Sequence, residues 1–141
     1  IIRCDRKSHM TQVDFSKLND QDLAEAAFDE SLGFCRAKAI TELASRAVVN
    51  PHLLDRACEA IASDRRVGFH TGPPLGWFGA DEIYLSGHAV AVRSLLRQMD
   101  NWDPAEQEDL VRHWAGRRGL AELTRELQTT YQWEPRYSLK S

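Results

Sequence analysis

The chain has 141 residues, of which 18 are Lys or Arg and 21 are Asp or Glu, so its formal net charge is −3. A chain with this balance carries no polybasic arm of the kind that binds nucleic acid. No apolar run approaches the roughly eighteen residues that span a membrane, and no secretory leader is visible, so we expect a cytoplasmic protein without membrane contact. Basic residues that are mostly Arg, together with abundant Ala, are typical of a bacterial genome rich in GC pairs.

Three segments differ in character along the chain. The opening residues read unlike the rest, and Ser8-His9-Met10 resembles the scar that a cloning vector leaves before a native start. About 130 further residues suffice for one domain with a single core. We therefore expect a vector-derived leader at residues 1–9, a single helical domain at residues 10–131 and an extended or flexible C-terminal tail at residues 132–141.

The first predicted helix begins after Asn19, whose side chain can cap it, and acidic residues such as Asp20 follow where the helix dipole favours them. Apolar residues then recur at steps of three and four from Leu23 to Ala47. The stripe continues past Gly33, so we interpret this stretch as one long helix with Gly33 at a close packing contact. A break at Gly33 is the alternative.

A tight corner between two helices is predicted next. The apolar pattern stops at Val49, and Asn50 can cap a new helix with its side-chain oxygen. Pro51 fits the first helical position, because its missing N–H would be unpaired there anyway. The second helix of the corner then carries apolar residues from Leu54 to Ile61.

A change of composition follows from Val67 to Ala80, where glycine and proline residues are interleaved with aromatic and aliphatic side chains. This composition predicts one long irregular loop. Helical order is expected to return at Asp81 and to continue as one helix to Met99, because the apolar residues there step by four and three along one face. These residues are Leu85, Ala89, Val92, Leu96 and Met99.

Asp103-Pro104 repeats the cap followed by proline, and Glu106 stands where it could complete a capping box. A last helix is expected from Leu120 to about Tyr131. No stretch alternates polar and apolar residues for long enough to form a strand. The sequence therefore predicts an all-α fold, an irregular bundle of five to six helices that contains a helix–turn–helix-like corner and one long aromatic loop rich in Gly and Pro.

The corner resembles DNA-binding helix–turn–helix units in its spacing of small, apolar and capping residues. The resemblance rests on Leu43, Ala44, Ala47, Val49, Asn50, Pro51, Leu54 and Arg56. In that family the second helix enters the major groove, so the resemblance implies that His52, Leu53 and Arg56 would face DNA, in a possible homodimer. Acidic residues on the same predicted helix would repel the phosphates, which makes DNA binding the alternative rather than the main hypothesis.

The aromatic loop is the main candidate for a binding surface. Its large side chains would form a docking patch for a protein partner if they are exposed, because binding residues gather on loops and aromatic residues dominate interface energies. The alternative is that the rings fold back over the helical core. The predicted partner-binding residues are Phe69, His70, Leu75, Trp77 and Phe78.

The chain lacks the sequence patterns of common catalytic and metal sites. It has no zinc-type cysteine pair, no histidine pair on a helix, no phosphate-binding loop and no nucleophile elbow, so we predict no cofactor, no metal and no catalytic residue. Cys35 and Cys58 are expected to be buried, reduced thiols. Arg65 and His70 resemble, in their spacing, the arginine and histidine motif of a family of helical ribonucleases, which would make the chain an enzyme that uses His70. If the chain has an active site, we expect it around the aromatic loop, at His70, Glu82 and His88.

These patterns lead to a ranked expectation for the function. The first hypothesis is a non-enzymatic helical regulatory or adaptor protein that acts by protein–protein binding through the aromatic loop. The second is a helix–turn–helix transcription regulator that binds DNA, and the third is an enzyme.

Overall fold

The computed structural model describes residues 14–63 and 74–137, in which the all-α prediction is confirmed and no strand occurs. These residues form α1 (Asp20–Ala27), α2 (Cys35–Val49), α3 (Leu54–Ser63), α4 (Gly76–Ser86), α5 (Ala89–Met99), α6 (Pro104–Ala115) and α7 (Leu120–Tyr131). Single turns of 3-10 helix add η1 (Phe15–Lys17), η2 (Glu30–Leu32) and η3 (Pro51–Leu53). The proposed leader at residues 1–9, Arg65, Phe69 and His70 lie outside the described residues.

The expected single helix from Asp20 to Val49 is wrong, because Gly33 divides it. α1 ends at Ala27, and η2 leads to Gly33, whose φ of 57° is one that residues with a side chain rarely adopt. α2 then begins at Cys35. The apolar stripe continues across the break because both helices bury one face in the same core, so their patterns happen to stay in register.

A second glycine divides the other predicted helix. Gly87 adopts a left-handed conformation (φ 69°, ψ 7°) and ends α4, after which α5 begins at Ala89. The expectation of one helix running from Asp81 to Met99 is therefore wrong. Leu85, which the pattern placed on the buried face, is exposed instead. Helix also begins earlier than predicted, at Gly76, so the aromatic loop cannot extend to Ala80.

The predicted corner is confirmed. α2 ends at Val49, and the side chain of Asn50 accepts a hydrogen bond from the backbone N–H of His52. Pro51 then opens one turn of 3-10 helix, η3, before α3 begins at Leu54. The capping box predicted at Asp103 is not formed, because the Asp103 side chain makes no capping bond to α6.

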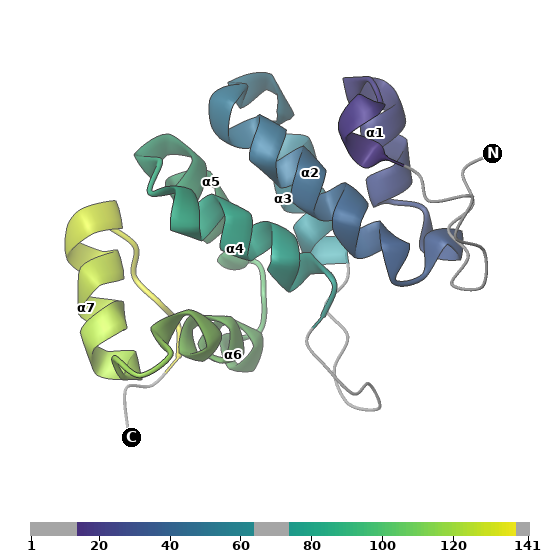
Figure 1. Cartoon of the computed structure of the whole chain (residues 1–141). Helices are drawn as coiled ribbons and strands as arrows, with labels where there is room; N and C mark the ends of the chain where they lie inside the picture. The colour runs from purple at the N-terminus through teal and green to yellow at the C-terminus, as the bar shows by residue number, and fades with distance from the viewer. Residues whose placement is uncertain (1–13, 64–73, 138–141) are drawn as a thin grey trace.

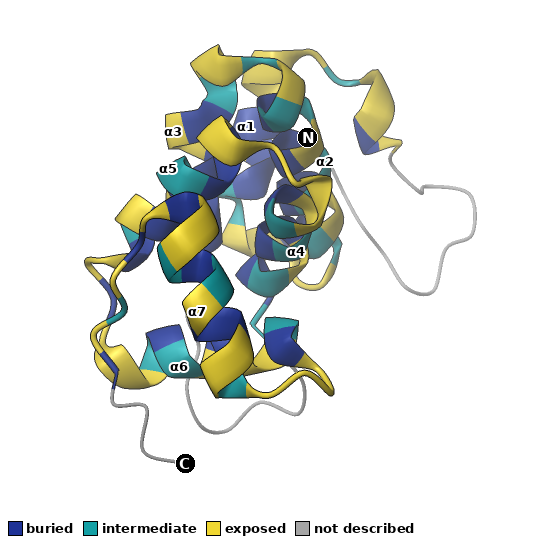
Figure 2. Ribbon diagram, turned by 90° about the vertical axis from the view of Figure 1, so that its left-hand side faces the viewer, coloured by how far each residue is buried: buried dark blue, intermediate teal, exposed yellow. Residues whose placement is uncertain are grey.

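The helices from α2 to α5 form two layers (Figure 1). α2 and α4 lie side by side in front and run in the same direction, while α3 and α5 pack together behind them. α1 covers one side of α2, and α6 and α7 pack together at the C-terminal end. Figure 2 shows buried residues on the inward sides of the helices and exposed residues outside.

Two glycines let α4 approach the backbone of its neighbours. A Cβ atom added to Gly76 would lie 2.2 Å from the carbonyl oxygen of Ile61 in α3. One added to Gly79 would lie 2.6 Å from the Cγ2 atom of Ile40 in α2. Any side chain at these positions would push the helices apart, so the spacing of the two layers depends on both glycines.

A buried arginine joins the ends of three helices. Arg36, in the first turn of α2, is only 4% exposed, and its Nε atom donates to the carbonyl oxygen of Ala27 at 2.7 Å. Its guanidinium also donates to the hydroxyl of Ser63. Ala27 ends α1 and Ser63 ends α3, so the positive charge lies where two helix dipoles are negative.

The segment after α7 is not helical, and it packs back across the preceding helices. Trp133 and Tyr137 are both buried. The indole N–H of Trp133 donates to a carboxylate oxygen of Asp100 at 2.9 Å, and the hydroxyls of Tyr137 and Thr124 are hydrogen-bonded at 2.7 Å. Residues 132–137 therefore hold α7 against the end of α5.

Replacing either glycine of α4 by alanine should destabilise the fold, although alanine favours a helix by about 1 kcal/mol. We expect Gly76→Ala to lower the free energy of unfolding by about 2 kcal/mol, because a backbone atom of Ile61 blocks the new methyl group. Gly79→Ala should lower the free energy of unfolding by less than Gly76→Ala does, since the Ile40 side chain can shift. Urea denaturation measures the free energy of unfolding of both variants, and Thr130→Ala, at an exposed position, is the control. A Gly76→Ala protein more stable than the wild type would contradict the close approach of α4 to Ile61.

One of the two cysteines in the described residues differs from the expectation of buried, reduced thiols. Cys35 is only partly buried at the start of α2 and is disulfide-bonded, so the expectation of a buried, reduced thiol is wrong for this residue. Cys58 is free and buried, as expected. Burial raises the pKa of the Cys58 thiol to about 12, and the nearby Asp55 and Glu59 carboxylates add to this effect.

We expect Cys58 in the folded protein to resist alkylation by iodoacetamide at about pH 8, because the thiolate is the reacting form. Mass spectrometry of the peptide that contains Cys58 measures the extent of labelling. The same peptide from protein unfolded in urea serves as the positive control. Equal labelling rates in the folded and unfolded proteins would show that this thiol is not buried.

Candidate functional site

A groove of about 490 Å³ lies between α2 and α4. Its walls include Phe34, Lys38 and Glu42 on the α2 side and Leu75, Phe78 and Glu82 on the α4 side. Clefts of this size are common in binding sites for small molecules and for protein segments. The groove is therefore the best candidate for a functional site in the described residues.

Helical spacing explains why these side chains share the groove. On the α2 side Phe34, Lys38 and Thr41 follow one another at steps of four and three, so they lie on one face. The opposite face of α2 carries the core residues Ile40 and Leu43. The groove residues of α4 follow the same spacing, and the close approach at Gly79 brings the two faces together.

Large apolar side chains are exposed on the groove walls. Phe34 is 65% exposed and Phe78 is 46% exposed, whereas Leu75 is buried and lies at the base. Exposed large hydrophobic side chains are also concentrated on these two helices, with Val49 at the end of α2 and Leu85 near the end of α4. Contiguous apolar surface on a soluble protein typically marks an interaction site.

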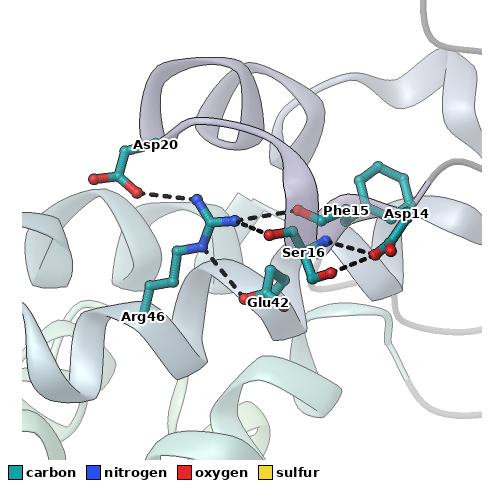
Figure 3. Close-up of polar contacts among 6 residues, drawn as sticks. All are labelled: Asp14, Phe15, Ser16, Asp20, Glu42 and Arg46. Atoms are coloured by element: carbon teal, nitrogen blue, oxygen red, sulfur yellow. Dashed lines mark hydrogen bonds and ion pairs between the residues drawn. The ribbon is translucent and has the colours of Figure 1, made fainter.

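Arg46, beside the groove, forms an ion pair with Glu42 of the groove wall (Figure 3). The Nε atom of Arg46 donates to Oε2 of Glu42 at 3.3 Å, and its Nη1 atom lies 3.0 Å from Oδ1 of Asp20. The remaining nitrogen donates to the carbonyl oxygens of Phe15 and Ser16. Arg46 therefore offsets the charge of Glu42 and ties η1 and the start of α1 to α2.

The structure separates the five predicted partner-binding residues. Phe69 and His70 lie outside the described residues. Leu75 and Phe78 come together in the groove, as a buried base and an exposed wall. Trp77 is only half-buried and does not line the groove; its ring packs on His113 of α6 with centroids 4.9 Å apart. Trp77 and Phe78 belong to α4 rather than to a loop, because the helix already begins at Gly76.

The residues implied by the helix–turn–helix resemblance lie at the corner between α2 and α3. His52 and Arg56 are exposed, and Leu53 is partly buried. The guanidinium of Arg56 lies over the ring of Phe28, 4.9 Å from its centroid, and its Nη1 atom is 3.5 Å from Oε2 of Glu59. Arg56 is thus engaged within the protein, through an aromatic ring and a neighbouring carboxylate.

A polar and aromatic cluster joins α4 to α6, and the sequence analysis missed it. One oxygen of Asp81 lies 3.0 Å from Nε2 of His113, and the other accepts a hydrogen bond from the indole of Trp114 at 2.8 Å. The Trp114 ring stacks on Tyr84 with centroids 4.5 Å apart. Partial burial raises the pKa of the Tyr84 hydroxyl. The partners are at least 30 residues apart in sequence, so no local pattern could have paired them.

The structure does not bring the residues of the enzyme hypothesis into one described site. Glu82 lines the groove, His88 is the exposed residue before α5, and His70 lies outside the described residues. Within residues 14–63 and 74–137, no group of three or more His, Cys, Asp or Glu side chains is placed to hold a metal ion. None of the helices described there has the length and apolar character needed to cross a membrane.

Asp81→Ala should weaken the contact between α4 and α6, because His113 and the Trp114 indole lose their shared acceptor. We expect the free energy of unfolding to fall by about 1 to 2 kcal/mol, which urea denaturation followed by tryptophan fluorescence measures. Glu82→Ala, at the next position, is the matched control and should have little effect. Equal stability of the two variants would show that the cluster contributes nothing.

Comparison with protein-family models, with curated proteins and with solved structures finds no match to this chain. No relative therefore assigns a ligand, an activity or a partner to the groove. The shape of the groove, its apolar side chains and its charges are the features that indicate its function.

Proposed function

We propose that this chain is a non-enzymatic helical protein of the regulatory or adaptor class, which binds another protein through the groove between α2 and α4. The observation that carries the proposal is the pair of exposed phenylalanines, Phe34 and Phe78, on the walls of an apolar groove. Large aromatic side chains that fill or line a pocket contribute much of the energy at protein interfaces. The binding surface lies on a helix pair and not on a loop, because Phe78 belongs to α4.

Burial of the two rings by a partner would supply part of the binding energy, and contacts elsewhere on the groove would have to supply the rest. Full burial of an exposed Phe side chain contributes about 1.5 to 3 kcal/mol. Given their exposed fractions, Phe34 and Phe78 would each contribute about 1 to 2 kcal/mol when a partner covers them. Contacts of the partner with Lys38 and Glu82 would fix its orientation more than its affinity.

DNA binding by the corner between α2 and α3 has less support. Arg56 would have to leave Phe28 and Glu59 to reach a phosphate, and Asp55 adds a further negative charge in the first turn of α3. Repulsion between these carboxylates and DNA would oppose binding. Binding to a duplex that weakens steeply with salt would favour this alternative over the groove.

Peptides selected from a display library on the wild-type protein should include groove binders. We expect the Phe34→Ser/Phe78→Ser double variant to lose roughly a hundredfold in affinity for them, because two apolar anchors are removed. Val90→Ser is the matched control, since Val90 is also exposed but lies on α5. Fluorescence polarisation measures the affinities, and circular dichroism checks that each variant is folded.

Two results would contradict the proposal that a partner binds in the groove. Selected peptides that bind the double variant as well as the wild type would place the binding surface elsewhere. Equal losses in Val90→Ser and in the double variant would point to general stickiness of exposed apolar residues instead of a site.

A further inference from the structure

We propose that the partner that occupies the groove is a second copy of this chain, which packs face to face across a two-fold axis. This inference rests on the proposed function of the groove as a docking site. It adds the identity of the partner, which the shape of the groove alone does not give.

The two walls of the groove carry unpaired charges of opposite sign. Lys38 lies on α2 and Glu82 lies on α4, and neither forms an ion pair within the part of the chain that the structure describes. Glu42 differs, because Arg46 binds it. After this internal pairing the groove retains one positive charge on one wall and one negative charge on the other.

This distribution of charge makes the groove complementary to the same groove on a second copy of the chain. In a two-fold interface the same surface is used twice, so that when residue i of one subunit meets residue j of the other, j of the first also meets i of the second. An axis midway between Lys38 and Glu82 would place each beside its opposite in the second subunit, so that two ion pairs form at once. An unrelated partner would have to supply both charges separately.

Apolar surface extends along the same face. Among the described residues, the exposed large hydrophobic side chains are Phe34, Val49, Phe78, Leu85 and Val90, and all except Val90 lie on α4 or on α2 and its cap. Val49 continues the α2 stripe four residues after Ser45, and Leu85 follows Glu82 by three residues. A second copy would cover both stripes together.

The size of the face predicts a weak dimer. From Phe34 to Val49 the rise of an α-helix gives a length of about 22 Å, and the face is two helices wide. With helices about 10 Å in diameter, the area of the face is roughly 440 Å². This area is smaller than the roughly 800 Å² that each partner buries in a standard stable interface. We therefore expect dissociation in the micromolar range or weaker, and further weakening by salt, which screens the two ion pairs.

Analytical ultracentrifugation over a range from low micromolar to near-millimolar protein tests the proposal. The wild type should shift from monomer to dimer as concentration rises. Lys38→Glu and Glu82→Lys should each weaken dimerisation by about tenfold or more, because each change turns both ion pairs into like-charge contacts. Arg125→Glu, a charge reversal at an exposed position of α7, should have little effect.

Charge exchange provides the sharper test. The double variant Lys38→Glu/Glu82→Lys should regain dimerisation to nearly the wild-type level, because both pairs form again with their signs exchanged. A mixture of the two single variants should form a mixed dimer, since one subunit then offers two carboxylates and the other two ammonium groups. Lys38 and Glu82 are exposed, and circular dichroism checks the folding of every variant.

The outcomes separate this inference from the function on which it rests. A wild type that stays monomeric at all concentrations overturns self-pairing, and so does a dimer that the single charge reversals leave unchanged or that the double exchange fails to restore. If such a monomer still binds groove peptides in a way that depends on Phe78, the docking function stands without the dimer. If neither dimer nor peptide binding depends on Phe78, both proposals fall.

Discussion

The arrangement of this protein depends on the close approach of α4 to α2 and α3. Gly76 and Gly79 leave no side chain between α4 and its neighbours, so backbone and Ile side chains come into direct contact. This contact sets α4 parallel to α2 in the front layer and leaves their outer faces beside each other (Figure 1). The groove, its two phenylalanines and its opposite charges all exist because these two faces are neighbours.

The sequence predicted most helices because their signals are local. The corner at Asn50-Pro51 and the helix that starts at Pro104 depend on capping and proline geometry, which a few adjacent residues decide. The break at Gly33 was not predicted because the apolar repeat stays in phase across it. The break at Gly87 was not predicted because Leu85 and Ala89 continue the apolar spacing of α5, although both are exposed. Periodicity alone cannot tell one helix from two consecutive helices that bury faces in the same core.

The candidate site was only partly predictable. Phe78 and Leu75 stood out as apolar residues in a segment rich in glycine, but the glycines that suggested a loop serve helix packing instead. Phe34 was missed because the assumed continuous helix hid its place at the start of α2, away from the buried stripe. The pairing of Asp81 with His113 depends on tertiary structure, which no spacing in the sequence encodes.

The buried guanidinium of Arg36 has a consequence for the way in which the N-terminal half unfolds. Its charge is solvated by the last residue of α1 and the last residue of α3, so it is stable inside the protein only while both helix ends are formed. If the end of α3 frays, the buried ion loses the hydroxyl of Ser63 and keeps only the carbonyl of Ala27, which is costly for a charge inside the protein. Opening of one helix end is thereby coupled to the other, and α1, α2 and α3 should open and close as one cooperative unit.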